Sequence, residues 1–285
     1  MAASRAARLA GHLRVVHPFP SVLDGIVAGG AAWLAGGAGE TAARLAISMI
    51  LLQASVGALN DVVDAPRDAG RKSGKPIPAG LVEARVALTI SAVAAAAGLL
   101  LAVPSGPATL GLAVVLLALG YGYDLLAKGT AWSWVPFAIA IPLFPTYGWL
   151  GAAGTVPPVW PVLLVVAALA GAALAIGNGV VDLERDRDAG LASAATVLGH
   201  ARAVWLEALL IVAAAAAAVG VLWARSAIVP GGVAIAAGLG LALGGARLLA
   251  AARPATRERG WELQAVGIAV AAIGWLAGLA AVGGP

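Results

Sequence analysis

Long apolar segments alternate with short polar ones along almost the whole chain of 285 residues. A helix needs about 17 to 25 apolar residues to cross a hydrocarbon core of about 30 Å. Nine segments of roughly this length can be drawn, at residues 21–38, 43–60, 84–103, 107–126, 131–151, 157–181, 200–224, 228–250 and 262–283. The pattern predicts an all-α fold, a polytopic membrane bundle of about nine transmembrane helices that forms a single integral membrane domain over residues 1–285.

Composition agrees with a membrane protein and excludes several kinds of site. Hydrophobic residues make up 61% of the chain, and its mean hydropathy of +0.94 lies far above the soluble range. The chain has no cysteine, which excludes a disulfide framework, a thiolate metal site and a thiol nucleophile.

The basic residues predict how the chain is oriented in a cell membrane. If the N-terminus is cytoplasmic, sixteen of the eighteen Lys and Arg residues fall on the cytoplasmic side, and only Arg44 and Arg225 fall outside. This bias is the one that the positive-inside rule describes, and it places the C-terminus outside. The net charge of +4 then indicates contact with anionic lipid at the inner face, with nucleic acid not expected as a partner.

Two acidic clusters stand out, at residues 60–68 and 178–188, because they hold seven of the fourteen Asp and Glu residues. A shift of 118 positions superposes six identical residues within nine positions, including Asn60 on Asn178 and Asp64 on Asp182. Such similarity at matching helix ends indicates a duplicated helical unit. Duplicated membrane folds place shared sites where their repeats meet, so the two clusters are expected to face each other at the cytoplasmic side.

Helical spacing predicts which polar groups share a face. Residues four apart lie one turn apart, which pairs Asn60 with Asp64 and Asp182 with Asp186. Pro66 disfavours helical geometry at the preceding residue, so we expect the helix to end near Asp64.

The residue types in the clusters favour a hard cation. Oxygen ligands without sulfur suit Mg²⁺, which usually shares its coordination shell with substrate phosphates. A phosphorylated substrate is therefore expected, with the basic residues beside the clusters as its counter-charges. Asp68, in the turn that should follow the helix, is a further candidate ligand.

These motifs resemble those of the UbiA superfamily of intramembrane prenyltransferases, over nearly the whole chain. The similar elements are Asn-Asp-x-x-Asp-x-x-x-Asp at 60–68, Lys-Pro-x-x-x-Gly at 75–80, Tyr-x-x-x-x-Lys at 123–128, Asp-x-x-x-Asp at 182–186 and the stretch 187–199. Two positions depart from the family pattern: Gly179, where many members have Asp, and Leu191, where Lys is frequent.

The resemblance implies a bundle with a cavity that opens laterally to lipid and binds an isoprenyl diphosphate. Its Mg²⁺ ligands would be Asn60, Asp61, Asp64, Asp68, Asp182 and Asp186. Its diphosphate-binding residues would be Arg67, Arg71, Lys75 and Lys128. Its catalytic residues would be Asp64, Asp182, Lys128 and Tyr123. The prenyl group would pass to an aromatic or other lipophilic acceptor.

Several residues also have plainer interpretations. Arg67 and Arg71 would occupy a cytoplasmic loop of any orientation-biased protein, and Tyr123 could belong to an interfacial aromatic belt. Asp124 could pair with Lys128 across one helical turn. The other plain assignments are His17 and Arg14 as membrane anchors, and Glu184 and Asp188 as solvated side chains.

Alternative functions remain open from the sequence. Prenyl transfer to a phosphorylated sugar and cyclisation of the prenyl chain would use the same motifs. A cation or proton-coupled transporter would also place acidic groups at a repeat interface. Against transport, the segments far from the clusters carry almost no polar groups. A structural scaffold would leave the acidic clusters unexplained.

Overall fold

The computed structural model describes residues 4–70 and 74–282, and in this part of the chain the regular elements are all helical. The α-helices are α1 (Arg5–Val15), α2 (Pro18–Leu34), α3 (Gly39–Asp68), α4 (Ala84–Ala102), α5 (Pro107–Gly122), α6 (Trp134–Ala153), α7 (Trp160–Val181), α8 (Leu183–Asp188), α9 (Ala194–Leu198), α10 (His200–Ala224), α11 (Ile228–Leu249) and α12 (Pro254–Val282). A 3₁₀ turn, η1 (Val103–Ser105), and a π-helical segment, η2 (Tyr123–Ala127), complete the set.

Eight of the described helices are long and apolar enough to cross a membrane. They match the second to ninth predicted segments. The first segment corresponds to α2, whose 17 residues stand at the lower limit of a span. The predicted all-α membrane bundle is confirmed, and its count of nine is approximate.

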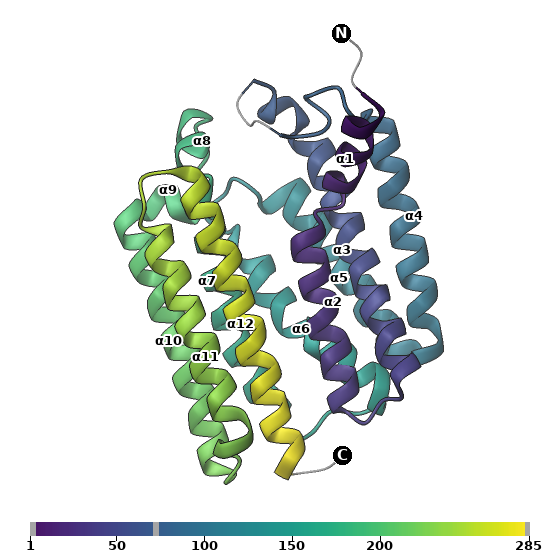
Figure 1. Ribbon diagram of the computed structural model, residues 1–285, viewed down its shortest axis with the longest axis vertical. Coiled ribbons are helices and arrows are strands. Elements are labelled where there is room, and N and C mark those ends of the chain that lie inside the picture. The colour runs from purple at the N-terminus through teal and green to yellow at the C-terminus, as the bar shows by residue number, and fades with distance from the viewer. Residues whose placement is uncertain (1–3, 71–73, 283–285) are drawn as a thin grey trace.

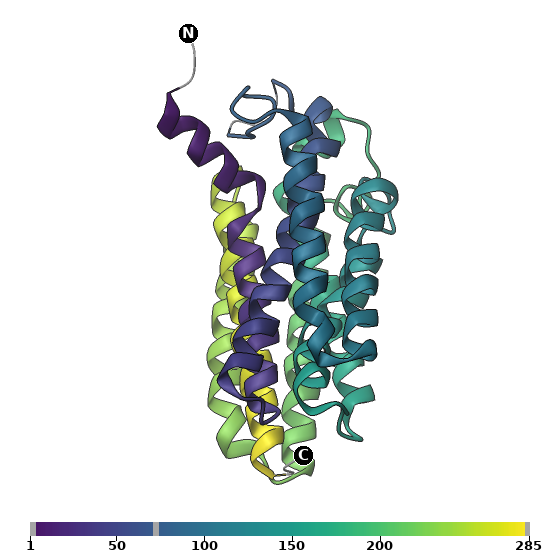
Figure 2. The ribbon, with the colours of Figure 1, turned by 90° about the vertical axis from the view of Figure 1, so that its right-hand side faces the viewer.

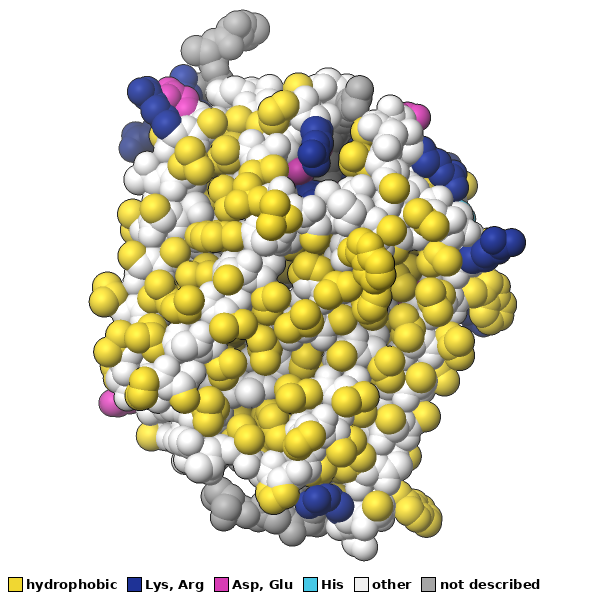
Figure 3. Space-filling model, turned by 180° about the vertical axis from the view of Figure 1, so that it is seen from behind, with side chains coloured by type: hydrophobic (Ala, Val, Ile, Leu, Met, Phe, Trp, Pro, Cys, Tyr) yellow, Lys and Arg dark blue, Asp and Glu magenta, His cyan; other side chains and the backbone are white. Residues whose placement is uncertain are grey.

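The long helices run side by side along the long axis of the molecule (Figures 1 and 2). At one end lie α1, α8, α9 and the connection between α3 and α4, whereas α12 finishes at the opposite end. Apolar side chains cover most of the middle of the surface, and Lys and Arg side chains lie toward its ends (Figure 3). This distribution fits a bundle with a lipid-facing central belt.

Proline and glycine set several helix boundaries. Proline is the first residue of α2, α5 and α12, where its missing N–H costs no intrahelical bond. Gly154 ends α6 in a left-handed conformation, with φ +74°, that other residues adopt only with strain.

The helix α3 continues past the point at which the sequence predicts its end. It runs to Asp68, with Pro66 inside its last turn, so the prediction of an end near Asp64 is wrong. Pro66 removes one hydrogen bond to the preceding turn. The loss is tolerated because the helix ends only two residues later. Asp68 therefore lies one turn beyond Asp64 on the same helix.

Small residues let neighbouring helices pack closely. A Cβ atom at Gly148 of α6 would lie 1.9 Å from the Ala28 carbonyl oxygen of α2. A Cβ at Gly238 of α11 would lie 2.4 Å from the Gly267 carbonyl oxygen of α12. Close backbone approach of this kind is a usual source of helix association in lipid, and here it fixes how the helices around the central cavity are rotated.

Candidate active site

A cavity of about 710 Å³ lies inside the bundle, lined by residues from α2, α3, α5, η2, α6, α7, α10, α11 and α12. One end of its lining is polar and includes Asn60, Asp64 and Asp182. Its other end is apolar and includes Val166 and Trp275. The cavity thus joins a charged head region to a long apolar channel.

The two acidic clusters face each other at the polar end. A smaller polar recess there is lined by Asp64 and Asp68 from α3 together with Asp182 and Asp186 from the other cluster. The carboxylates that lie 118 positions apart in the sequence therefore share one site, as the repeat predicts.

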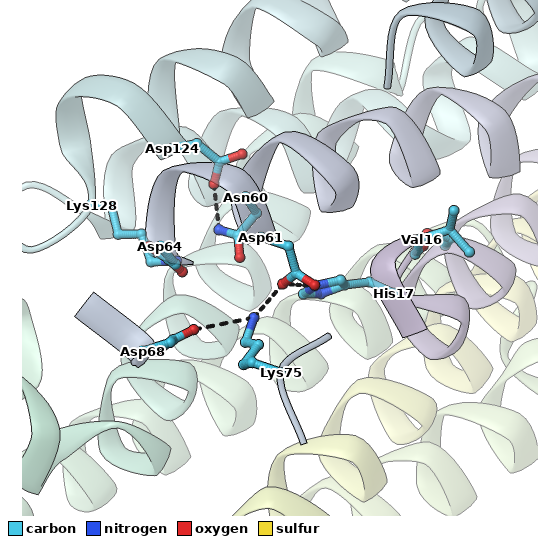
Figure 4. Close-up of polar contacts among 10 residues, drawn as sticks. Val16, His17, Asn60, Asp61, Asp64, Asp68, Lys75, Asp124 and Lys128 are labelled. Carbon is cyan, nitrogen blue, oxygen red and sulfur yellow. Dashed lines mark hydrogen bonds and ion pairs between the residues drawn. The ribbon is translucent and has the colours of Figure 1, made fainter. Parts of the chain in front are cut away.

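In the first cluster, Asn60 contacts η2 (Figure 4). Its side-chain amide donates a hydrogen bond of 2.6 Å to Asp124 Oδ1, and Asp124 is buried. The sequence interpretation that Asp124 pairs with Lys128 is wrong. The π-helical turn places the Lys128 N–H on the Tyr123 carbonyl, and the Lys128 side chain reaches another partner.

That partner is Asp64, to which the Lys128 ammonium donates (Figure 4). The ammonium also lies 5.9 Å from the centre of the Tyr123 ring. Tyr123 packs edge-on against Phe137, at 5.2 Å between ring centres, and both residues line the cavity together with Asn178. Tyr123 therefore lines the cavity, which favours a site role over an interfacial belt.

Asp61 ties two distant segments to α3 (Figure 4). Its Oδ1 accepts from His17 Nε2 at 2.9 Å and from Lys75 Nζ at 2.5 Å. Lys75 also lies 3.7 Å from Asp68 Oδ2. Asp61 is 2% exposed, and its Oδ2 has no hydrogen-bond partner among the described residues.

The interpretation of His17 as a simple membrane anchor is wrong, because its ring joins α2 to α3 through Asp61. A Cβ atom added at Gly57 would lie only 3.0 Å from the His17 Cβ, so glycine at this position provides room for the contact. His17 also has φ +46°, a left-handed conformation that turns the chain between α1 and α2. The prolines at 18 and 20 are the sequence signal for this turn.

The second cluster lies where α7 ends. Asp182 is the residue between α7 and α8, so Asp182 and Asp186 do not lie on one continuous helix. The Asp186 N–H nevertheless bonds the Asp182 carbonyl at 2.9 Å, which keeps them one turn apart. Asp182 forms an ion pair with Arg185. Burial raises the pKa of Asp186, and a hydrogen bond from Ser193 and the charge of Lys128 offset part of that rise.

Glu184 has a partner that the sequence did not indicate. Both of its carboxylate oxygens accept from Arg257 of α12, with Nη1 at 3.0 Å from Oε1. Hydrogen bonds from Arg257 lower the pKa of Glu184. Glu184 is exposed, as its interpretation as a solvated side chain expected, but it also pairs with Arg257, which is 1% exposed. The pair holds α8, and with it the second cluster, against α12.

Arg67, Arg71 and the two departures from the family pattern are the remaining positions that the sequence singles out. Arg67 is exposed and lines the smaller recess. Arg71 lies outside the described residues. At the two departures from the family pattern, a side chain at Gly179 would crowd the Ala195 Cβ, at 3.0 Å, and Leu191 packs against Gly129. Both departures therefore have a packing explanation.

The polar end has the donor chemistry of a site for a hard cation. Its side chains offer carboxylate and amide oxygens from both clusters, without sulfur. Among the described residues, no three His, Asp or Glu side chains are already grouped around one point. Instead Lys75, Lys128 and Arg185 neutralise the carboxylates in pairs.

Sequence reasoning did not name Asn178 as a site residue. It lines both the cavity and the smaller recess, as Tyr123 does. The signal was present, because the internal repeat superposes Asn178 on Asn60, which was named as a ligand.

An all-helical membrane bundle, with two Asp motifs at the polar end of an apolar cavity, defines the class of intramembrane prenyltransferases. The sequence profile of the UbiA prenyltransferase family matches residues 25–264, so the chain belongs to that family. No protein of curated function matches the chain at a significant level.

Solved structures show the same fold. A UbiA homologue from Aeropyrum pernix K1, in its apo form, has a TM-score of 0.73 and 19% identity, over 89% of this chain and 96% of its own. A digeranylgeranylglyceryl phosphate synthase has a TM-score of 0.67 and 18% identity, over 95% and 98%. A UbiA homologue from Archaeoglobus fulgidus, bound to GPP and Mg²⁺, has a TM-score of 0.65 and 20% identity, over 75% and 78%.

Proposed function

We propose that this protein is a Mg²⁺-dependent prenyltransferase that moves an isoprenyl group from a prenyl diphosphate to an aromatic or other small lipophilic acceptor. The observation that carries the proposal is the convergence of both Asp motifs on the polar end of one apolar cavity. The homologue structures with bound GPP or DMAPP and Mg²⁺ support it.

The cavity has the shape that a prenyl diphosphate requires. The diphosphate would lie between the clusters, and the prenyl tail would extend along the apolar lining. On α7 the lining runs from Asn178 to Leu163, about 22 Å at 1.5 Å per residue. The space can therefore hold a chain of several isoprene units beside an acceptor.

Asn60, Asp64, Asp68, Asp182 and Asp186 would hold the Mg²⁺ ions. Bound Mg²⁺ supplies Lewis-acid stabilisation of the charge that grows on the diphosphate as it leaves. All five side chains offer the oxygen donors that this ion prefers. Asp61, also predicted as a ligand, contributes in another way, because its Oδ1 holds His17 and Lys75 in place.

The lysines at the site would exchange partners when the donor binds. Lys128 now neutralises Asp64, and Lys75 neutralises Asp61 and contacts Asp68. With the donor in place, the Lys128 ammonium can move from Asp64, which Mg²⁺ would neutralise, onto a phosphate oxygen, and the Lys75 ammonium can leave Asp68 for a phosphate oxygen while it keeps Asp61. Every buried charge then keeps a partner. This matters because an unpaired buried charge is costly in a membrane protein.

The reaction itself follows from this arrangement. The bond between the first prenyl carbon and the diphosphate oxygen breaks, and the diphosphate leaves with the electron pair. The Tyr123 ring, which already lies near a cation, would stabilise the allylic cation. The acceptor then forms a bond to that carbon and loses a proton, while the apolar lining keeps water away.

Other reactions use the same donor site. Transfer to a phosphorylated sugar and cyclisation have no contact in the structure that favours them. Ion transport is disfavoured because the lining around Val166, Ala218 and Trp275, far from the clusters, is apolar. The polar end would face the cytoplasm, in line with the distribution of basic residues.

The test uses the full-length protein in lipid nanodiscs with Mg²⁺, geranylgeranyl diphosphate and a lipid extract of the source organism. We expect release of diphosphate and a product whose mass exceeds that of an extract component by one prenyl group. If prenyl diphosphates of ten to twenty carbons all remained intact, the proposal would be wrong.

A further inference from the structure

One charged side chain in the cavity is not explained by the donor site. Asp24 of α2 lines the cavity, and it makes no hydrogen bond or ion pair with any described residue. A carboxylate inside a membrane protein is costly when it is unpaired, and such residues usually mark functional sites. Asp24 is therefore a candidate contact for something that the protein binds.

The packing of α2 fixes the direction of Asp24. A Cβ at Gly25 would lie 2.4 Å from Ile50, and a Cβ at Gly29 would lie 2.7 Å from the Ala46 Cβ, so this glycine face of α2 packs directly on α3. Successive residues of a helix are rotated by about 100°. The neighbouring Asp24 is thereby turned away from α3 and into the cavity.

The end of α2 is also held in place, by the contact between His17 and Asp61. Asp24 lies seven residues below His17, about 10 Å along the helix axis. Gln53 lies seven residues below Asn60 on the antiparallel α3, at a similar depth, and also lines the cavity. Among the described residues, its amide donates only to the weak acceptor Met49 Sδ, at 3.9 Å. Asp24 and Gln53 therefore form a polar level of the cavity lining, about 10 Å from the diphosphate site.

Aromatic residues adjoin this level. Phe19 of α2 and Trp261 of α12 both line the cavity and pack edge to face, at 6.3 Å between ring centres. A planar molecule that lies against them would have one edge toward the diphosphate site and the other toward Asp24. This is the position that an acceptor must occupy.

Among the described residues, the basic side chains of the lining are confined to one region of the cavity. The basic lining residues all lie near the clusters: Arg14, His17, Lys75 and Lys128. At the depth of Asp24 the described lining offers no basic side chain, and Glu262, next to Trp261 of the aromatic pair, is acidic as well. An acceptor carboxylate at the depth of Asp24 would meet a second acidic group and no basic partner, whereas a hydroxyl or amine could donate a hydrogen bond to an Asp24 oxygen.

We propose that Asp24 determines acceptor specificity by accepting a hydrogen bond from an O–H or N–H group of the acceptor. The site then takes neutral or cationic acceptors in preference to those that carry a carboxylate at that position. This inference rests on the proposed function, because it assumes that a prenyl donor occupies the cluster end.

The experiment compares three phenols that differ in one group: 4-hydroxybenzyl alcohol, tyramine and 4-hydroxybenzoate. Full-length wild type, Asp24→Asn and Asp24→Lys are placed in nanodiscs with geranylgeranyl diphosphate and Mg²⁺, and initial rates of prenylation are measured. Glu40→Gln is the control, since it removes an exposed carboxylate in the first turn of α3.

Wild type should prefer the neutral and cationic phenols to 4-hydroxybenzoate by at least about tenfold, the size expected of one hydrogen bond to a charged group. Asp24→Asn should reduce this ratio toward one, Asp24→Lys should reverse it, and Glu40→Gln should keep the wild-type ratio. The nearly isosteric Asp24→Asn carries the test if Asp24→Lys does not fold.

Two outcomes overturn the inference. One is the same acceptor ratio in wild type and Asp24→Asn, and the other is a wild type that prenylates none of the three phenols. Release of diphosphate without an acceptor is measured in parallel. If it occurs, a failure belongs to the Asp24 inference alone, and if it does not, the proposed function fails as well.

Discussion

The ammonium group of Lys128 donates to the carboxylate of Asp64, a residue 64 positions earlier in the chain. The contact joins η2 to α3 at the polar end of the cavity, and it balances one charge of the first cluster. In the proposed reaction the same ammonium moves to the diphosphate. Lys128 therefore has a partner in both states, and its removal should affect both.

Lys128→Met should raise the donor concentration needed for half-maximal rate by at least about tenfold, because a hydrogen bond between two charged groups is lost. Steady-state kinetics with geranylgeranyl diphosphate measure this change. Arg85→Met is the matched control, since Arg85 is 84% exposed and pairs only with the nearby Glu83 among the described residues. Equal kinetics in the two variants would assign Lys128 a structural role alone.

Asp61 and Asp182 should differ in what they control. Asp61→Asn weakens the bonds to His17 and Lys75, so it should lower the melting temperature in detergent while measurable turnover remains. Asp182→Asn should lose turnover that extra Mg²⁺ does not restore, with little change in melting temperature. Thermal unfolding and a Mg²⁺ titration on both variants decide the matter, and the reverse order would exchange the two roles.

The Arg257–Glu184 pair should stabilise the second cluster. Glu184→Ala leaves the buried Arg257 guanidinium without its carboxylate, which is the costly way to break such a pair. The melting temperature should fall in Glu184→Ala and fall less in the double variant Glu184→Ala, Arg257→Met. A double-mutant cycle with additive effects would show that the two side chains do not interact.

The orientation of the chain can be tested independently of its chemistry. A reporter that is active only in the cytoplasm should be silent when fused after Pro285. The same reporter should be active when inserted at Gly190, in the turn after α8. Activity at both positions would mean that the chain crosses the membrane an even number of times between Gly190 and Pro285, instead of the predicted three.

The sequence predicted the helices and the two motifs because both depend on local chemistry. Apolar length determines which helices can cross a membrane. Carboxylates are so unfavourable in lipid that Asp64 and Asp182 had to belong to a site. The repeat added that the two would meet, which the shared recess shows.

What the sequence could not predict depends on tertiary contacts. The π-helical turn of η2 directs Lys128 to Asp64 instead of to Asp124, and helical spacing alone favours the wrong partner. The pair of Glu184 with Arg257 joins residues 73 positions apart, and no periodic pattern signals it. Asp24 lies within a predicted span, and only the packing of α2 on α3 shows that it faces the cavity.

The central claim is that one site, built from both Asp motifs, binds and ionises the prenyl diphosphate. The most direct test is Mg²⁺-dependent diphosphate release by wild type, Asp64→Ala and Asp182→Ala, each folded in nanodiscs as judged by its melting temperature. The account predicts that either substitution alone abolishes release, as chelation of Mg²⁺ does in wild type. Near-normal release in either variant would contradict it.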